Sequence, residues 1–74
     1  MKLYDSDNGH EVGYVRDNMI HATRCNASYA IEGVAIVDNN GLVGPVGAVV
    51  GTFDDGKFCN RDGQLMAVSK SYFI

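Results

Sequence analysis

The 74-residue sequence lacks the features that mark several large classes of protein. It has no tryptophan, one proline and two cysteines, and no apolar run approaches the roughly 20 residues that a transmembrane helix needs. The N-terminus turns polar at Asp5, without a signal-peptide core. These absences predict a cytoplasmic protein without a membrane role, in which Cys25 and Cys59 are packed thiols in a reducing compartment.

Clustered positive charge and helical periodicity are also missing. The net charge is −3 and the six lysines and arginines form no run, so a nucleic-acid partner is not expected. No window places apolar residues at i, i+3, i+4 and i+7 over three turns, which argues against helices. The length predicts a single domain, residues 1–74. A monomer of this size is marginally stable and often relies on a partner subunit.

Glycine and turn-forming pairs are abundant instead. Nine glycines separate short segments rich in β-branched and aromatic residues, which predicts strands. Tight hairpin turns are predicted at Asn8-Gly9, Asn40-Gly41, Asp55-Gly56 and Asp62-Gly63, with a further reversal at residues 44–47. The predicted strands are residues 2–5, 10–15, 19–24, 31–37, 42–43, 48–53, 57–60, 64–69 and 71–74, each antiparallel to the next.

A degenerate repeat runs through nearly the whole chain. Residues 12–15, 34–37, 50–53 and 66–69 each read as a large apolar residue, Gly or Ala, a variable residue and a usually apolar one. Each repeat unit opens with an apolar residue, and a fifth unit is unfinished: the openers are Leu3, Ile20, Leu42, Phe58 and Ile74, at spacings of 17, 22, 16 and 16 residues. The long second unit is attributed to an irregular insertion at residues 25–30, with a short helical turn capped by Asn26 or Ser28 as one possibility.

The repeat predicts how the units assemble. Small residues at one repeat position (Gly13, Ala35, Gly51 and Ala67) suggest units crowded around an axis. The apolar residues before them (Val12, Val34, Val50 and Met66) are expected to be buried. Closure of the ring is assigned to residues 72–74, pairing near Leu3. The predicted fold is all-β: four β-hairpin repeats in a closed or nearly closed small antiparallel sheet.

This pattern resembles the small bacterial four-fold β-flower domains. The matching positions are the openers Leu3, Leu42 and Phe58, the turn glycines Gly9, Gly47 and Gly63, and the apolar-small segments. The family has no assigned activity, so the resemblance carries over no functional residue. PRC-type and other small barrels share the Val-Gly-x-Val segment that follows an Asp-x-x-Gly turn.

Residues that could carry chemistry are few and scattered. His21 and Cys25, with Cys59, offer one loose set of metal ligands, whereas zinc sites usually show two close pairs. Neither cysteine lies where a nucleophile would be activated. The segment 5–9 resembles half of a calcium loop, but position 15, where the bidentate Glu should follow, is Val. No catalytic, metal or cofactor-binding residue is therefore assigned.

Two functions remain open. The first is a non-enzymatic binding or assembly module that is homo-oligomeric or acts on a protein partner. The alternative is a small-ligand or metal-binding protein that uses the loop around Cys25 with His21.

Overall fold

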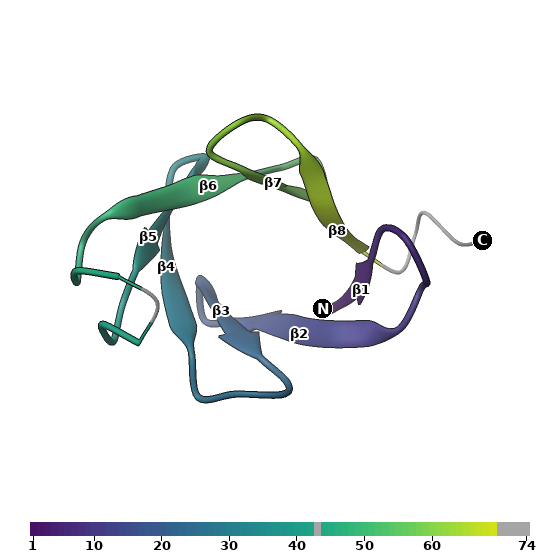
Figure 1. The fold of residues 1–74 in the computed structure, drawn as a ribbon, viewed down its shortest axis with the longest axis horizontal. Coiled ribbons are helices and arrows are strands. Elements are labelled where there is room, and N and C mark those ends of the chain that lie inside the picture. Colours follow the sequence, from purple (N-terminus) through teal and green to yellow (C-terminus); the bar gives the residue numbers. More distant parts are fainter. Residues whose placement is uncertain (43, 70–74) are drawn as a thin grey trace.

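The structure, a computed structural model, describes residues 1–42 and 44–69, and all regular structure in that part of the chain is β (Figure 1). The strands are β1 (Lys2–Asp5), β2 (Glu11–Arg16), β3 (Met19–Ala22), β4 (Ser28–Glu32), β5 (Ala35–Asp38), β6 (Val49–Asp54), β7 (Lys57–Asn60) and β8 (Leu65–Ser69). Each strand pairs antiparallel with the next, and β8 pairs with β1, so the sheet closes into a barrel. The predicted all-β fold of hairpins in a closed sheet is confirmed.

The two ends of the barrel differ in their connections. Two-residue turns at residues 17–18, 33–34 and 55–56 make one end, which we call the short-turn end. Asp17 and Asn18 both have positive φ, 54° and 64°, as a tight turn between twisted strands requires. The longer connections at residues 6–10, 23–27, 39–48 and 61–64 make the other, long-loop end. In Figure 1 these four connections lie on four sides of the ring.

Three of the long loops are held by the same pair of hydrogen bonds to the last residue of the preceding strand. The last residue of β1, β5 and β7 is Asp5, Asp38 and Asn60, respectively. In each case Oδ1 accepts a hydrogen bond from the backbone N–H two residues later, at 2.7–3.3 Å. The carbonyl oxygen of the same residue accepts from a loop glycine with positive φ; these are Gly9, Gly47 and Gly63. The three glycines matched in the sequence are therefore structurally equivalent, although their loops differ in length.

The strand pairing of the barrel changes how the chain divides into repeat units. Leu3, Ile20 and Phe58 occupy one position of their units, but the third unit is opened by Ile36 and not by Leu42. Leu42 lies in the 39–48 loop with 56% of its surface exposed, and it belongs to no strand. The long unit is therefore the third, because its extra residues lie between β5 and β6.

The same shift corrects the expected insertion at residues 25–30. Ser28, Tyr29 and Ala30 lie in β4, where Tyr29 and Ala30 each have partners in β3 and in β5. The irregular stretch is residues 23–27, and removing 25–30 would remove three of the five residues of β4. The predicted strand 31–37 is interrupted by the turn at residues 33–34, since Glu32 pairs with Ala35. The predicted strands 42–43 and 71–74 and the fifth opener Ile74 include residues outside the described part of the chain.

The expected burial of the first motif position is wrong. Val34 and Met66 are 54% and 43% exposed, and Val12 and Val50 are only partly buried. The buried core cluster instead consists of Leu3, Ile20, Ile36 and Ala67. The strand pairing explains this result. Val12, Val50 and Met66 are skipped where the register shifts at a β-bulge, and Val34 lies in a turn. The residues that follow the three bulges are the ones paired with core positions: Gly13 with Leu3, Gly51 with Ile36 and Ala67 with Phe58.

The small residues do mark crowded positions at two sites. A Cβ on Gly13 would lie 2.7 Å from the carbonyl oxygen of His21, and a Cβ on Gly51 would clash with that of Cys59. Ala35 is not their equivalent, because it flanks the 33–34 turn. The barrel closes through β8 on β1, where Ser69 pairs with Leu3. The closing role assigned to residues 72–74 lies outside the described residues.

Candidate functional site

The residues weighed as metal ligands or nucleophiles do not form one group. His21 lies in β3 and stacks on Tyr14, with ring centroids 5.0 Å apart. Cys25 is exposed in the 23–27 loop, and Cys59 is half-buried in β7, which is not a neighbour of β3 in the barrel. Within residues 1–42 and 44–69, no three His, Cys, Asp or Glu side chains gather as a metal site would require.

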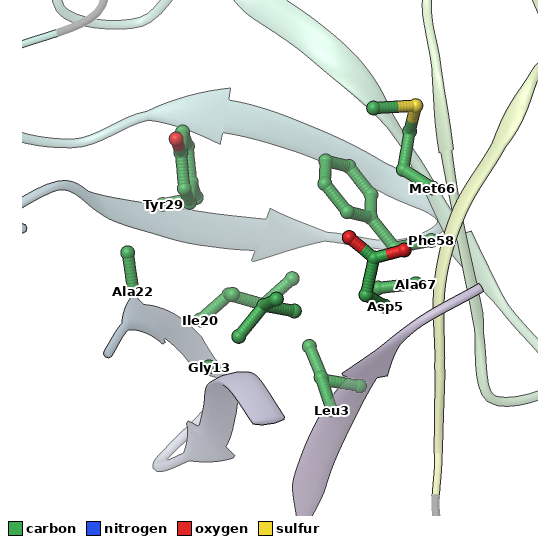
Figure 2. A pocket seen from close by; sticks show the side chains of 10 residues that line it. Leu3, Asp5, Gly13, Ile20, Ala22, Tyr29, Phe58, Met66 and Ala67 are labelled. Carbon is green, nitrogen blue, oxygen red and sulfur yellow. The ribbon is translucent and has the colours of Figure 1, made fainter. Parts of the chain in front are cut away.

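An apolar cavity of about 220 Å³ lies inside the barrel (Figure 2). Strands β1, β2, β3, β4, β7 and β8 contribute to its wall. Leu3, Ile20 and Phe58 line it in the middle of the barrel, and Asp5, Val12, Ala22, Tyr29 and Met66 line it nearer the strand ends that meet the long loops. The cavity therefore extends from the core toward the long-loop end.

The cavity borders repeat positions that mostly carry small residues. Gly13, Tyr29, Gly51 and Ala67 are equivalent in the corrected register, each lying opposite the opener of its unit. Three of these four positions carry little or no side chain, and only Tyr29 projects a large group. The Tyr29 ring reaches toward Phe58, with centroids 6.5 Å apart and planes tilted by 39°. Gly13, Ala67 and Tyr29 all line the cavity.

The lining is apolar with two polar exceptions, the Asp5 carboxyl and the Tyr29 hydroxyl. The Oδ1 atom of Asp5 accepts a hydrogen bond from the Asp7 backbone N–H at 2.7 Å, which fixes the carboxylate at the start of the loop. Its Oδ2 atom has no hydrogen-bond donor among the described residues. Asp5 therefore offers an acceptor at the wall of an apolar space.

Tyr29 is held in its neutral form. Burial raises the pKa of its hydroxyl, and the proximity of Cys25 and then of Asp38 adds to the rise. The phenol therefore stays protonated at neutral pH and can donate a hydrogen bond.

Asp38 is the most buried ionisable side chain of the described residues, at 1% exposure. Its Oδ1 accepts from the backbone N–H groups of Asn40 and Gly41 at 3.3 and 3.2 Å, while its buried Oδ2 has no hydrogen-bond partner among residues 1–42 and 44–69. Asp38 does not line the cavity, and these hydrogen bonds hold the start of the 39–48 loop.

Sequence reasoning missed the cavity, although it named some of the lining residues for other reasons. Tyr29 falls within the expected insertion at residues 25–30, and Asp5 begins the segment that was compared with a calcium loop. The available signal was the spacing of 16 residues from Gly13 to Tyr29, which equals that from Gly51 to Ala67. That spacing places a large ring where the other units have Gly or Ala.

Comparison of the chain with protein-family models, curated proteins and solved structures finds no match. The resemblance to the four-fold β-flower domains accordingly stays a prediction. The described residues contain no helix long and apolar enough to cross a membrane. The fold and the cavity therefore define the class to which this chain is assigned, a small closed antiparallel barrel with an internal apolar site.

Proposed function

We propose that the protein is a non-enzymatic binding module that holds one small, mainly apolar molecule in the cavity at the long-loop end. The observation that carries this proposal is the cavity itself, about 220 Å³ and walled by six of the eight strands. A space of roughly 150 Å³ lined by apolar side chains is enough to bind benzene. The expected occupant is therefore a molecule with one aromatic ring or a short carbon chain.

The chemistry of the lining favours binding over catalysis. The described residues of the lining include no His, Cys, Ser, Thr or Lys side chain that could act as a nucleophile or as its base. Its two polar groups, on Asp5 and Tyr29, make no hydrogen bond to another ionisable side chain among the described residues. Groups placed in this way orient a ligand more readily than they transfer a proton.

The test uses benzyl alcohol as a neutral probe and a variant that fills the cavity. Ala22→Leu adds three carbon atoms to the lining, whereas Ala35→Leu adds the same atoms at a residue of β5 that does not line it. Amide chemical-shift titration is expected to show saturable shifts at Leu3, Ile20 and Tyr29 in the native chain and in Ala35→Leu. Ala22→Leu, if folded, is expected to lose them. Absence of saturable shifts in the native protein, both with benzyl alcohol and with charged molecules of the same size, would refute the proposal.

Self-association is a second candidate function, supported by a separate observation. Leu42 and Val46 in the 39–48 loop and Val49 at the start of β6 are large apolar side chains that are each about half exposed or more. Large exposed apolar side chains that follow closely in one segment can contact another chain. The proposed partner is a second copy, because a chain of this size gains much of its stability from added buried surface.

Sedimentation velocity tests this second candidate. The native chain is expected to sediment as an oligomer at high concentration, and Leu42→Ser with Val46→Ser is expected to yield monomers. Val34→Ser, at an equally exposed valine of the short-turn end, serves as the control and should leave the oligomer intact. A native chain that stays monomeric at millimolar concentration would rule this candidate out.

A further inference from the structure

We propose that the ligand of the cavity is a compact organic cation, a protonated amine carried on one aromatic ring or a short alkyl body. This inference rests on the proposed binding function and adds the charge of the ligand. It follows from the distribution of charge and of aromatic rings around the cavity.

The charge in the wall of the cavity has one sign. Among the described residues, Asp5 is the only acidic residue in the lining, and no Lys, Arg or His lines the space. The Asp7 N–H engages Oδ1 of Asp5, and no described residue donates a hydrogen bond to Oδ2. A carboxylate beside apolar surface attracts a cation more strongly than the same carboxylate in water, because the local dielectric constant is lower.

The sheet register places an aromatic ring beside this carboxylate. Ala67 of β8 pairs with Asp5 of β1 on one side and with Phe58 of β7 on the other. The small side chain of Ala67 leaves the space between them open, and Figure 2 shows the Asp5 carboxylate and the Phe58 ring on the same side of the cavity. An ammonium group held by the carboxylate would therefore lie close to the face or edge of Phe58.

Tyr29 adds a second aromatic ring to the lining of the cavity. Its ring lies next to that of Phe58, 6.5 Å centroid to centroid, so the two rings form one aromatic part of the wall. Aromatic faces attract cations within about 6 Å of the ring centroid. One carboxylate and two aromatic rings, with no basic side chain among the described lining residues, suit a cationic group carried on an apolar body. An anion of the same size would meet the charge of Asp5 without a compensating group.

The experiment compares three probes of similar size at neutral pH: benzylamine as the cation, benzyl alcohol as the neutral molecule and benzoate as the anion. Amide chemical-shift titrations give a dissociation constant for each. Benzylamine is expected to bind about tenfold to a hundredfold more tightly than benzyl alcohol, the range that a hydrogen bond to a charged group supplies. Benzoate is expected to bind more weakly than benzyl alcohol.

Two matched variants assign the preference to Asp5. Asp5→Asn removes the charge but keeps an Oδ1 acceptor for the Asp7 N–H, so the loop is expected to stay folded. Asp7→Asn removes the same charge from an exposed residue that does not line the cavity. The advantage of benzylamine over benzyl alcohol should vanish in Asp5→Asn and persist in Asp7→Asn.

The outcomes separate this inference from the function on which it rests. If benzyl alcohol binds and benzylamine binds no more tightly, the cavity is a binding site but the cationic ligand is refuted. If Asp5→Asn and Asp7→Asn lose the preference equally, the net charge of the chain and not Asp5 causes it, which also refutes the inference. If none of the three probes binds the native protein, both the inference and the proposed function are overturned.

Discussion

Tyr29 and Asp38 are directly paired across β4 and β5, at the long-loop end of the barrel. The pair places the carboxylate of the most buried acid near a partly buried phenol. Burial raises the pKa of Tyr29, and Cys25 and Asp38 add to the rise. One consequence is that the charge state of Tyr29 is linked to the stability of the fold.

We expect stability to fall as the pH rises through the range of tyrosine ionisation. The pKa of Tyr29 is higher in the folded chain than the value of about 10 in the unfolded chain. The folded state therefore holds the phenolic proton more tightly, and this contribution is fully present below pH 10 and is lost as the pH rises through the folded pKa. Urea unfolding at pH 9 and pH 11 should show a smaller loss of stability for Tyr29→Phe than for the native chain. Equal losses in the two proteins would contradict this prediction.

Ile36 and Leu42 distinguish the corrected repeat from the one read in the sequence. Ile36 is fully buried in the core cluster, whereas Leu42 is exposed in the 39–48 loop. Ile36→Ala is expected to lower the free energy of unfolding by about 2–5 kcal/mol, and Leu42→Ala to change it by less than about 0.5 kcal/mol. Chemical denaturation of the two variants provides the measurement. A larger loss of unfolding free energy for Leu42→Ala than for Ile36→Ala would support Leu42 as the opener of the third unit.

Gly51 and Gly33 test two different requirements for glycine. A Cβ on Gly51 would clash with the carbonyl oxygen of Cys59 and lie 3.0 Å from the Phe58 ring. Gly33 has open space around it but a φ of +66°. Gly51→Ala is expected to cost at least about 3 kcal/mol because backbone must move, and Gly33→Ala about 1 kcal/mol from its left-handed conformation. Thermal unfolding of both variants measures the difference, and similar costs would count against the close contact between β6 and β7.

Asn60 tests whether the hydrogen bonds shared by three of the long loops stabilise them. Its Oδ1 accepts from the N–H groups of Asp62 and Gln64, both at 3.0 Å. Asn60→Ala is expected to cost about 1–2 kcal/mol, since two loop N–H groups lose their acceptor. Asn60→Asp should restore most of the loss, because Asp stands at the equivalent positions 5 and 38. Failure of Asp to rescue the variant, with stability read from thermal unfolding, would argue that the three loops are not equivalent.

The sequence by itself determined the class of fold. Closely spaced turn pairs such as Asp55-Gly56 leave room only for short strands, and short links force neighbouring strands to pair antiparallel. The repeat of glycines at 9, 47 and 63 was also correct, because each supplies a backbone conformation that its loop requires. These features are local, so they can be read without knowing what lies across the barrel.

The face of each strand, and with it the candidate site, was decided only by the tertiary structure. Residues 34–37 and 50–53 have the same sequence pattern, but Val34 lies in a turn and Val50 in a strand. Only the strand pairing distinguishes the two segments. Shifting a strand by one residue reverses which side chains point inward, so the core residue Ile36 could not be told from its neighbours by pattern. The cavity depends on the same register, since it brings Asp5 and Phe58 to either side of Ala67 from strands more than fifty residues apart in the chain.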